Sequence, residues 1–206
     1  LVSHELRLKK IIKLNQIHSS KVLIIDNINK LSDSLNADGL VTNLTGIGLS
    51  ILGADCAPIL FYDDNSKTIG ACHAGWRGAV DNIIESTIRS MEKIGANRKN
   101  INAVIGPTIQ KQSYEIREDV AKIVKESVSF NRNNLILSHI KDDRYLFDLP
   151  LLLKDSLKIS EINKIGDINI NTYDNNLFFS YRYSSHQNSS KQGTTGRHIS
   201  VIGKLK

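Results

Sequence analysis

Short runs of apolar residues, separated by turn-forming residues, predict several buried strands in the first half of the chain. The runs cover 21–26, 46–52, 58–62 and 68–73, and a polar turn at 63–66 separates the last two. Apolar runs of this length, bounded by Gly, Asp or Asn, are typical of strands buried on both faces. We therefore expect residues 58–73 to form a β-hairpin.

Helical spacing begins directly after this hairpin. Seven mostly apolar positions recur three and four residues apart, and a glycine follows them: Val80, Ile83, Ile84, Thr87, Ile88, Met91, Ile94 and then Gly95. This pattern predicts one amphipathic helix that ends at the glycine. Further along we expect helices at 118–127 and 149–158, strands at 101–105, 145–148, 177–181 and 198–202, and a polar loop at 183–193.

Strands and helices are mixed without strict alternation, which favours an α+β fold over a doubly wound sheet. The length of 206 residues predicts a single domain spanning 1–206. Hydrophobic residues make up 40% and charged residues 23%, as in globular proteins. The formal charge of +6 is scattered along the chain, so it indicates small anions as much as nucleic acid. We expect no nucleic-acid partner.

Cysteine usage and hydropathy predict a cytoplasmic protein with no membrane partner. Two cysteines, Cys56 and Cys72, are too few for a disulfide framework. No apolar stretch approaches the roughly 18 residues of a membrane span. Charged residues, at Glu5 and Arg7 among others, interrupt the N-terminal segment where a secretory signal would be apolar.

Reactive side chains are concentrated between Ala54 and Gly78. Asp55 and Cys56 lie in a predicted turn, and the run CHAGWRG at 72–78 lies where a strand passes into a helix. The positive end of that helix and the guanidinium of Arg77 predict an anion site. A tight, packed turn explains the same glycines and tryptophan equally well, so both interpretations stay open.

Strand alternation separates the two thiols. Cys72 and His73 are adjacent on one strand and point to opposite faces, so Cys72 is expected in the core. Cys56 can reach across the hairpin to His73, and together they make half a zinc site or a thiol–imidazole nucleophilic pair. The candidate third ligand is His18. The other histidines, His4, His139, His186 and His198, are interpreted as ordinary surface or strand residues.

Several motifs, taken in order, resemble those of a known family. They are QIHSSKV at 16–22, ADGLVT at 37–42, ADCAPIL at 54–60, GACHAGWRG at 70–78, IGP at 105–107 with YE at 114–115, and FFSYR at 178–182 with TGR at 195–197. From about residue 16 to the C-terminus the chain resembles the laccase-domain family. Its YfiH-like members were long labelled polyphenol oxidases and are now regarded as purine nucleoside phosphorylases.

The resemblance implies a metal-dependent enzyme that acts on purine nucleosides and phosphate. The family phosphorolyses adenosine, inosine, guanosine and methylthioadenosine, and some members deaminate adenosine. Its zinc ligands correspond to His18, Cys56 and His73, and its fold implies α/β/β/α layers with mixed sheets. The chain departs from the family in having only 15 residues before Gln16. It also has a longer loop at 183–193, for which a solvated loop is favoured over a lid.

Two arginines are candidates for binding phosphate, and one aspartate is a candidate catalytic residue. Arg77 is the first candidate for binding phosphate and Arg182 the second, although Arg182 fits a surface position at a strand end equally well. Asp55 is a candidate catalytic residue that orients a ligand histidine or transfers a proton; capping its own turn is the alternative. Six histidines and a single methionine, Met91, are too few for multicopper chemistry, so zinc is expected rather than copper.

Two other classes of function stay open. One is a cysteine hydrolase without metal, for example an amidase acting on cell-wall precursors, with Cys56 as nucleophile and His73 as base. The other is a non-catalytic domain that binds a partner. The paired-cysteine signature of cytidine deaminases is absent, so a deaminase activity would use a different scaffold.

Overall fold

The computed structural model describes residues 2–31, 34–128, 134–187 and 195–205. Its largest sheet has six strands in the order β11-β7-β5-β6-β3-β2. These are β2 Val22–Ile24, β3 Gly39–Thr42, β5 Ala57–Asp63, β6 Thr68–Ala74, β7 Ile101–Ile105 and β11 Lys164–Asp167. The predicted hairpin is confirmed, since β5 pairs antiparallel with β6 from Asp63 opposite Thr68 to Ala57 opposite Ala74. The pairs β2–β3 and β7–β11 are parallel, so the sheet is mixed.

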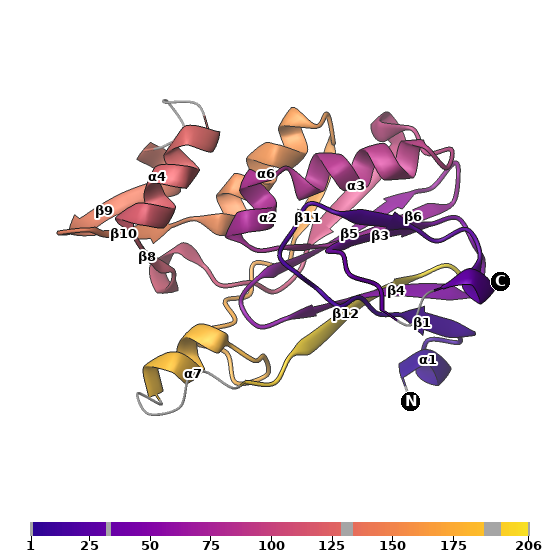
Figure 1. Cartoon of the computed structure of the whole chain (residues 1–206), viewed down its shortest axis with the longest axis horizontal. Coiled ribbons are helices and arrows are strands. Elements are labelled where there is room, and N and C mark those ends of the chain that lie inside the picture. The colour runs from indigo at the N-terminus through magenta and orange to yellow at the C-terminus, as the bar shows by residue number, and fades with distance from the viewer. Residues whose placement is uncertain (1, 32–33, 129–133, 188–194, 206) are drawn as a thin grey trace.

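A smaller sheet packs against one face of this sheet (Figure 1). It contains β1 Lys10–Ile12, β4 Ile47–Gly53 and β12 His198–Gly203, with β4 in the middle. Alternate residues of β4, Ile47, Leu49 and Ile51, are buried in one cluster with Leu40 of β3 and Ile69 of β6. The period of two therefore places one face of β4 against the large sheet, as expected for two stacked sheets.

Helices cover the opposite face of the large sheet (Figure 1). They are α2 Trp76–Val80, α3 Ile83–Glu92 and α6 Leu149–Ile159. The predicted amphipathic helix is confirmed at Ile83–Glu92, but its predicted start at Val80 is wrong, because α2 ends at Val80 and a new helix begins at Ile83. Asn82 lies between them with φ +60°, a left-handed conformation that asparagine tolerates better than most residues. The break turns α3 so that Ile84, Ile88 and Met91 are buried.

A third, small sheet and the remaining helices lie at the periphery. The sheet has the order β8-β10-β9, with β8 Glu115–Arg117, β9 Leu137–Lys141 and β10 Arg144–Phe147. The helical segments are α1 Val2–Glu5, α4 Glu118–Ser127, α7 Tyr181–Gln187, and the 3-10 turns η1 Ile28–Lys30, η2 Arg98–Asn100 and η3 Lys111–Ser113. In Figure 1, α1 and α7 lie on the side opposite α3. The predicted α+β class with mixed sheets is confirmed.

The strand predicted at 177–181 is wrong. Residues 176–178 form a turn, and Tyr181 begins α7. The hydroxyl of Ser180 accepts a hydrogen bond from the Tyr183 N–H, and its carbonyl accepts one from the Ser184 N–H. These local bonds start a helix in spite of the aromatic residues that favour a strand.

The polar loop predicted at 183–193 is therefore helical at 183–187, and its residues 188–193 lie outside the described residues. Within the described ranges, no helix combines the length and hydrophobicity that spanning a membrane requires.

Candidate metal centre

Three side chains that are distant in sequence converge at one end of the β5–β6 hairpin. One ligand atom from each of His18, Cys56 and His73 lies within 4.8 Å of the other two. Tetrahedral zinc ligands at ordinary bond lengths are about 3.5 Å apart, so small movements of the side chains would close the set around one ion. The three residues selected from the sequence thus form a geometry and a donor set that fit zinc.

Close packing of the backbone makes this convergence possible. Cys56 lies in the turn before β5, and His73 is opposite Pro58 near the end of β6. A Cβ atom on Gly75 would lie 2.7 Å from the Cys56 sulfur and 3.6 Å from Cδ2 of His18. Position 75 therefore requires glycine, because any side chain would displace the thiol.

Cys72 lies in the core, as predicted. Its side chain is fully buried on the face of β6 opposite His73, among the residues that pack under α3. Burial raises the pKa of its thiol to about 12, despite a hydrogen bond with Thr87. Cys72 is thus an unreactive thiol that cannot join the cluster.

Asp38, at the start of β3, is the carboxylate that contacts the cluster, and our sequence analysis gave it no role. Its Oδ1 lies 2.9 Å from Nδ1 of His73, and both side chains are buried. A carboxylate is only an acceptor, so Nδ1 carries the proton and Nε2 of the ring is free to bind a ligand. The available signal was the ADGLVT motif, which placed an aspartate in a family element without indicating its contact.

Hydrogen bonds outweigh burial in setting the charges of this cluster. Burial alone raises the pKa of Cys56, but hydrogen bonds with His18 and His73 lower it to about 7. Burial lowers the pKa of His73, but hydrogen bonds with Asp38 and Cys56 raise it to about 9. The pKa of Asp38 is likewise lowered to about 2, with His73 and Ser19 overcoming the effect of burial. The cluster therefore favours a thiolate, which serves as a metal ligand and as a nucleophile alike.

The cluster opens into a cavity of about 790 Å³. Such a volume suits a small organic substrate. Besides the cluster itself, the walls contain aromatic and cationic side chains, namely Trp76, Arg77, Tyr114, Tyr181, Arg182 and Arg197. The cavity therefore combines a cluster able to hold a metal, flat apolar surfaces and groups that bind anions.

Arg77 and Arg182 differ in the contacts that their guanidinium groups already make within the protein. The guanidinium of Arg77 lies 4.5 Å above the Trp76 ring, next to the start of α2. Arg182 donates from Nη1 to the carbonyl of Glu115 over 2.6 Å, and its guanidinium lies 5.4 Å from the centre of the Tyr114 ring. Of the two predicted anion-binding residues, Arg77 therefore has the guanidinium that is more available to bind an anion. Arg197, within the TGR motif, also lines the cavity but was not selected from the sequence.

Asp55 lies beside the cluster, and its contacts differ from the expected ones. Its carboxylate accepts hydrogen bonds from the Thr172 hydroxyl and the Arg182 backbone N–H, both over 2.7 Å. Its carbonyl accepts from the Thr108 hydroxyl over 2.6 Å. The hydrogen bond to a cluster histidine that we expected from Asp55 comes from Asp38 instead. Asp55 joins the turn that carries Cys56 to the C-terminal segment, whereas its role in proton transfer stays a prediction.

The four remaining histidines are described residues that do not belong to the cluster. Nδ1 of His186 is 3.0 Å from the Tyr173 hydroxyl, and Nε2 of His139 is 2.9 Å from the Asp142 carbonyl. His198 packs edge-on against Phe178, with the ring centres 5.2 Å apart. Within the described part of the chain, His18, Cys56 and His73 form the group of ligating side chains close enough together to share one metal ion.

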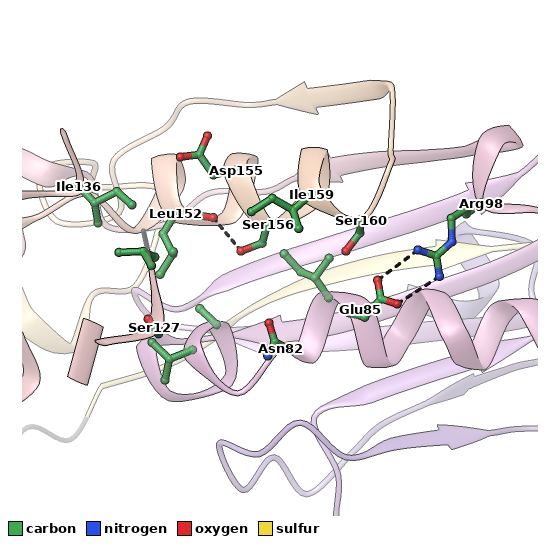
Figure 2. A pocket seen from close by; sticks show the side chains of 14 residues that line it. Asn82, Glu85, Arg98, Ser127, Ile136, Leu152, Asp155, Ser156, Ile159 and Ser160 are labelled. Carbon is green, nitrogen blue, oxygen red and sulfur yellow. Dashed lines mark hydrogen bonds and ion pairs between the residues drawn. The ribbon is translucent and has the colours of Figure 1, made fainter. Parts of the chain in front are cut away.

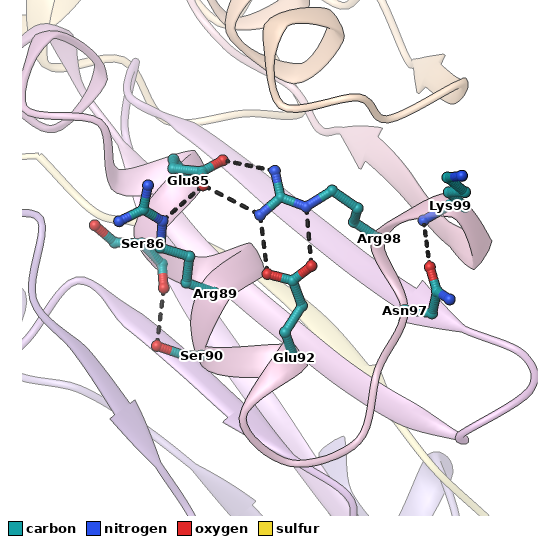
Figure 3. A network of polar contacts seen from close by, with 8 residues as sticks. All are labelled: Glu85, Ser86, Arg89, Ser90, Glu92, Asn97, Arg98 and Lys99. Atoms are coloured by element: carbon teal, nitrogen blue, oxygen red, sulfur yellow. Dashed lines mark hydrogen bonds and ion pairs between the residues drawn. The ribbon is translucent and has the colours of Figure 1, made fainter.

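A second cavity of about 360 Å³ lies between α3 and α6 (Figure 2). Aliphatic and polar side chains both line it, and its walls contain neither cysteine nor histidine. Two of its charged residues, Glu85 and Arg98, belong to a network in which Arg98 pairs with Glu85 and Glu92, and Arg89 pairs with Glu85 (Figure 3). These contacts fasten η2 to α3, so Glu85 and Arg98 have a structural role.

Comparisons with known proteins identify the family and the fold. A family model described as multi-copper polyphenol oxidoreductase laccase matches residues 1–204. A purine nucleoside phosphorylase of Rickettsia prowazekii is 34% identical over 174 residues, which are 84% of this chain and 70% of that protein. An adenosine deaminase from an unknown prokaryotic organism is 32% identical over 141 residues, 65% of this chain and 53% of that protein. The crystal structure of the hypothetical protein YfiH of Bacillus licheniformis superposes with a TM-score of 0.87 at 26% identity, covering all of this chain and 78% of the other.

Proposed function

Since the chain belongs to the family described as multi-copper polyphenol oxidoreductase laccase, whose curated relatives include purine nucleoside phosphorylases, we propose that it is a zinc-dependent purine nucleoside phosphorylase. The observation that carries the proposal is the cluster of His18, Cys56 and His73, which opens into a cavity lined by arginines and aromatic rings. Adenosine, inosine, guanosine and methylthioadenosine are the proposed nucleosides. The two free cysteines favour a reducing compartment, so we also propose a cytoplasmic location.

The proposed reaction transfers a ribosyl group from the purine to phosphate. A phosphate oxygen forms a bond to C1′ of the ribose while the bond from C1′ to the purine nitrogen breaks. The electron pair leaves with the base, which takes up a proton, and the products are the free purine and a ribose 1-phosphate. The sugar gains positive charge in the transition state, so holding the anionic phosphate against C1′ supplies much of the rate enhancement.

A divalent ion bound by the cluster would supply Lewis-acid chemistry, which polarises a bound oxygen. Zinc suits two imidazoles and one thiolate, and three protein ligands leave a fourth position for substrate or water. Zinc also fits better than the copper in the family description, because a multicopper enzyme needs more histidines than the six of this chain.

Arg77 is the proposed phosphate-binding residue. It is exposed at the start of α2 and lines the same cavity as the cluster. Its planar guanidinium can donate two parallel hydrogen bonds to a phosphate. Arg182 is proposed to contribute charge and to hold the cavity wall, because its Nη1 is already bonded to the Glu115 carbonyl.

Tyr181 is the proposed surface against which the purine base stacks. Three aromatic rings line the cavity, and two of them are covered by guanidinium groups: Trp76 by Arg77, and Tyr114 by Arg182. Tyr181 keeps 53% of its surface exposed. Stacking on an aromatic ring contributes about 1–3 kcal/mol per base and tolerates different purines.

Adenosine deamination is a second candidate activity, and the relative named adenosine deaminase favours it. In that reaction, water adds at C6 of the purine and ammonia leaves, so the product is inosine and phosphate is not required. The metal-free thiol hydrolase is the alternative, favoured by the lowered pKa of Cys56 beside His73.

Elemental analysis together with product analysis tests the proposal. The purified protein should contain about one zinc per chain, and free purine should appear from adenosine and inosine in proportion to added phosphate. His18→Ala should abolish activity as completely as Cys56→Ala, because each removes a ligand. Activity that survives both chelator and His18→Ala but is lost on alkylation of Cys56 would establish the thiol hydrolase. A protein that contains zinc yet releases neither purine nor ammonia would indicate a binding domain.

A further inference from the structure

We propose that Asp38 is a positioning residue that fixes two of the three metal ligands at once. One of these ligands, His73, is held through its ring, and the other, His18, is held through its backbone. The inference rests on the proposed metal centre, but it concerns how the chain shapes that centre and not the reaction. Five hydrogen bonds to a single buried carboxylate carry it.

The contact with His73 determines which ring nitrogen faces the cluster. Oδ1 of Asp38 lies 2.9 Å from Nδ1 of His73, and Asp38 is fully buried while His73 is 4% exposed. The backbone N–H of His73 also donates to the carbonyl of Asp38 over 2.8 Å. The imidazole is thus fixed at both its backbone and its Nδ1, and Nε2 is left as the ligand atom.

The same carboxylate organises the segment that carries His18. Oδ1 accepts a hydrogen bond from the His18 N–H over 3.0 Å. Oδ2 accepts from the N–H of Ile17 at 3.2 Å, and from the N–H and hydroxyl of Ser19 at 2.6 and 2.8 Å. Three successive backbone N–H groups therefore point at one carboxylate, as in an anion-binding nest.

This arrangement stabilises an unusual backbone conformation at His18. Its φ is +58°, in the left-handed region that is unfavourable for residues other than glycine. Hydrogen bonds to a charged carboxylate offset such a cost. Without the hydrogen bonds to Asp38, the unfavourable conformation of His18 is no longer offset. Segment 17–19 would then leave this turn, and the imidazole of His18 would lose its position relative to Cys56.

An amide at position 38 cannot replace the carboxylate. Both oxygens of Asp38 accept from N–H groups, whereas asparagine offers one oxygen and one NH2 group. Either orientation of the amide would direct its NH2 group at an N–H of the 17–19 segment or at Nδ1 of His73. Asp38→Asn preserves the size and shape of the side chain. Its effect therefore measures the loss of one acceptor oxygen and of the negative charge.

Asp63 provides a matched control. It is also fully buried, and its carboxylate accepts from the backbone N–H groups of Asn65, Ser66 and Asn97. It lies at the end of β5 opposite the end near Cys56. Asp63→Asn therefore removes a buried carboxylate acceptor of backbone N–H groups without touching the cluster.

Competition with a chromophoric zinc chelator measures the effect. We expect Asp38→Asn to weaken zinc binding about 10–100-fold and to change the visible absorption of the cobalt-substituted protein. Asp63→Asn should lose stability but keep the zinc affinity within about threefold of the wild type. An Asp38→Asn protein that folds, binds zinc like the wild type and keeps its cobalt spectrum would overturn the proposal.

A measurement on the unaltered protein keeps the proposal testable if Asp38→Asn does not fold. In zinc-loaded protein, nitrogen-15 spectra of the histidine rings should show a protonated Nδ1 and a metal-bound Nε2 for His73. A metal-bound Nδ1 would contradict the role of Asp38. These measurements test the role of Asp38 independently of the proposed activity. If the protein binds zinc tightly but releases no purine, the proposed activity is wrong, and the effect of Asp38 on zinc binding can still be measured.

Discussion

The carboxylate of Asp55 accepts a 2.7 Å hydrogen bond from the backbone N–H of Arg182 at the start of α7. The same carboxylate also accepts from Thr172, so the turn before Cys56 is joined directly to the C-terminal segment. Tyr181 and Arg182, which line the cavity, therefore depend on the residue next to a proposed metal ligand. We therefore expect the proposed binding of the purine base and the proposed binding of the metal to be connected through the Asp55 side chain.

Asp55→Asn separates the two roles considered for this aspartate. If Asp55 mainly holds α7, the variant should raise the KM for nucleosides several-fold and leave kcat and zinc content nearly unchanged. If it transfers a proton, kcat should fall by about 10²–10⁴ and its pH profile should lose one limb. Steady-state kinetics from pH 5 to 9, with zinc measured on the same samples, decides between these outcomes.

Tyr181→Ala should raise the KM for adenosine and inosine about tenfold, because the base loses its stacking surface. Initial rates at saturating phosphate measure this effect. Tyr183→Ala is the matched control, since Tyr183 lies on the same helix, is 47% exposed, and packs against Tyr173 outside the cavity lining. An equal loss in both variants would show that helix α7 as a whole was perturbed and would remove the stacking role.

Arg77→Gln should raise the KM for phosphate at least tenfold, because the variant loses the charged fork that binds the anion. Deamination of adenosine needs no phosphate, so its rate should change little in the same variant. Arg89→Gln serves as the control, because Arg89 is an exposed arginine on α3 that pairs with Glu85. A phosphate KM that is unchanged by Arg77→Gln would assign phosphate binding to Arg197 or Arg182.

Removal of the metal should make Cys56 reactive near neutral pH. Hydrogen bonds with His18 and His73 overcome burial and lower the pKa of Cys56 to about 7, so the thiolate forms as pH rises through 7. Alkylation by iodoacetamide after chelation should follow this titration and should stop when zinc is restored. Cys72 should stay unmodified, because burial raises its pKa to about 12. Mass spectrometry of tryptic peptides distinguishes the two sites.

Asp63 should contribute to stability above acidic pH and lose that contribution as pH falls. Burial raises the pKa of this carboxyl, but hydrogen bonds from the backbone of Asn97, Asn65 and Ser66 lower it below the unfolded value. A lowered folded pKa means that the stabilisation is complete above about pH 4 and declines at lower pH. The stability difference between wild type and Asp63→Asn, measured by urea unfolding, should therefore shrink between pH 5 and pH 3.

Two of the clustered residues, Cys56 and His73, could be selected from the sequence because strand geometry constrains them. The candidate third ligand, His18, has no such constraint and is supported by the resemblance of the motif at 16–22 to the family. The hairpin at 58–73 brings Cys56 near His73, and alternation along the strand sends Cys72 to the other face. Both inferences need only local pairing, which apolar runs and turn residues predict well. The role of Asp38 could not be predicted from the sequence, because its five hydrogen bonds join three separate segments. Such contacts leave no periodic pattern in the sequence.

The errors in the predicted elements have local causes. The break between α2 and α3 depends on the left-handed backbone of Asn82, which does not alter the apolar spacing. The segment before α7 was assigned to a strand because Phe178, Phe179 and Tyr181 have high strand propensity. Hydrogen bonds to Ser180 determined the outcome, and a serine that caps a helix resembles any other turn residue in a single sequence.

The close approach at Gly75 and the buried carboxylate of Asp38 mean that the three donor atoms meet only in the assembled sheets. An unfolded chain, in which successive donors are 38 and 17 positions apart, cannot present them together. Ion binding is thermodynamically linked to the folding equilibrium, and each tenfold rise in free zinc above its dissociation constant adds about 1.4 kcal/mol to the free energy of unfolding. Thermal denaturation midpoints should consequently report the ion occupancy of a preparation before any substrate is added.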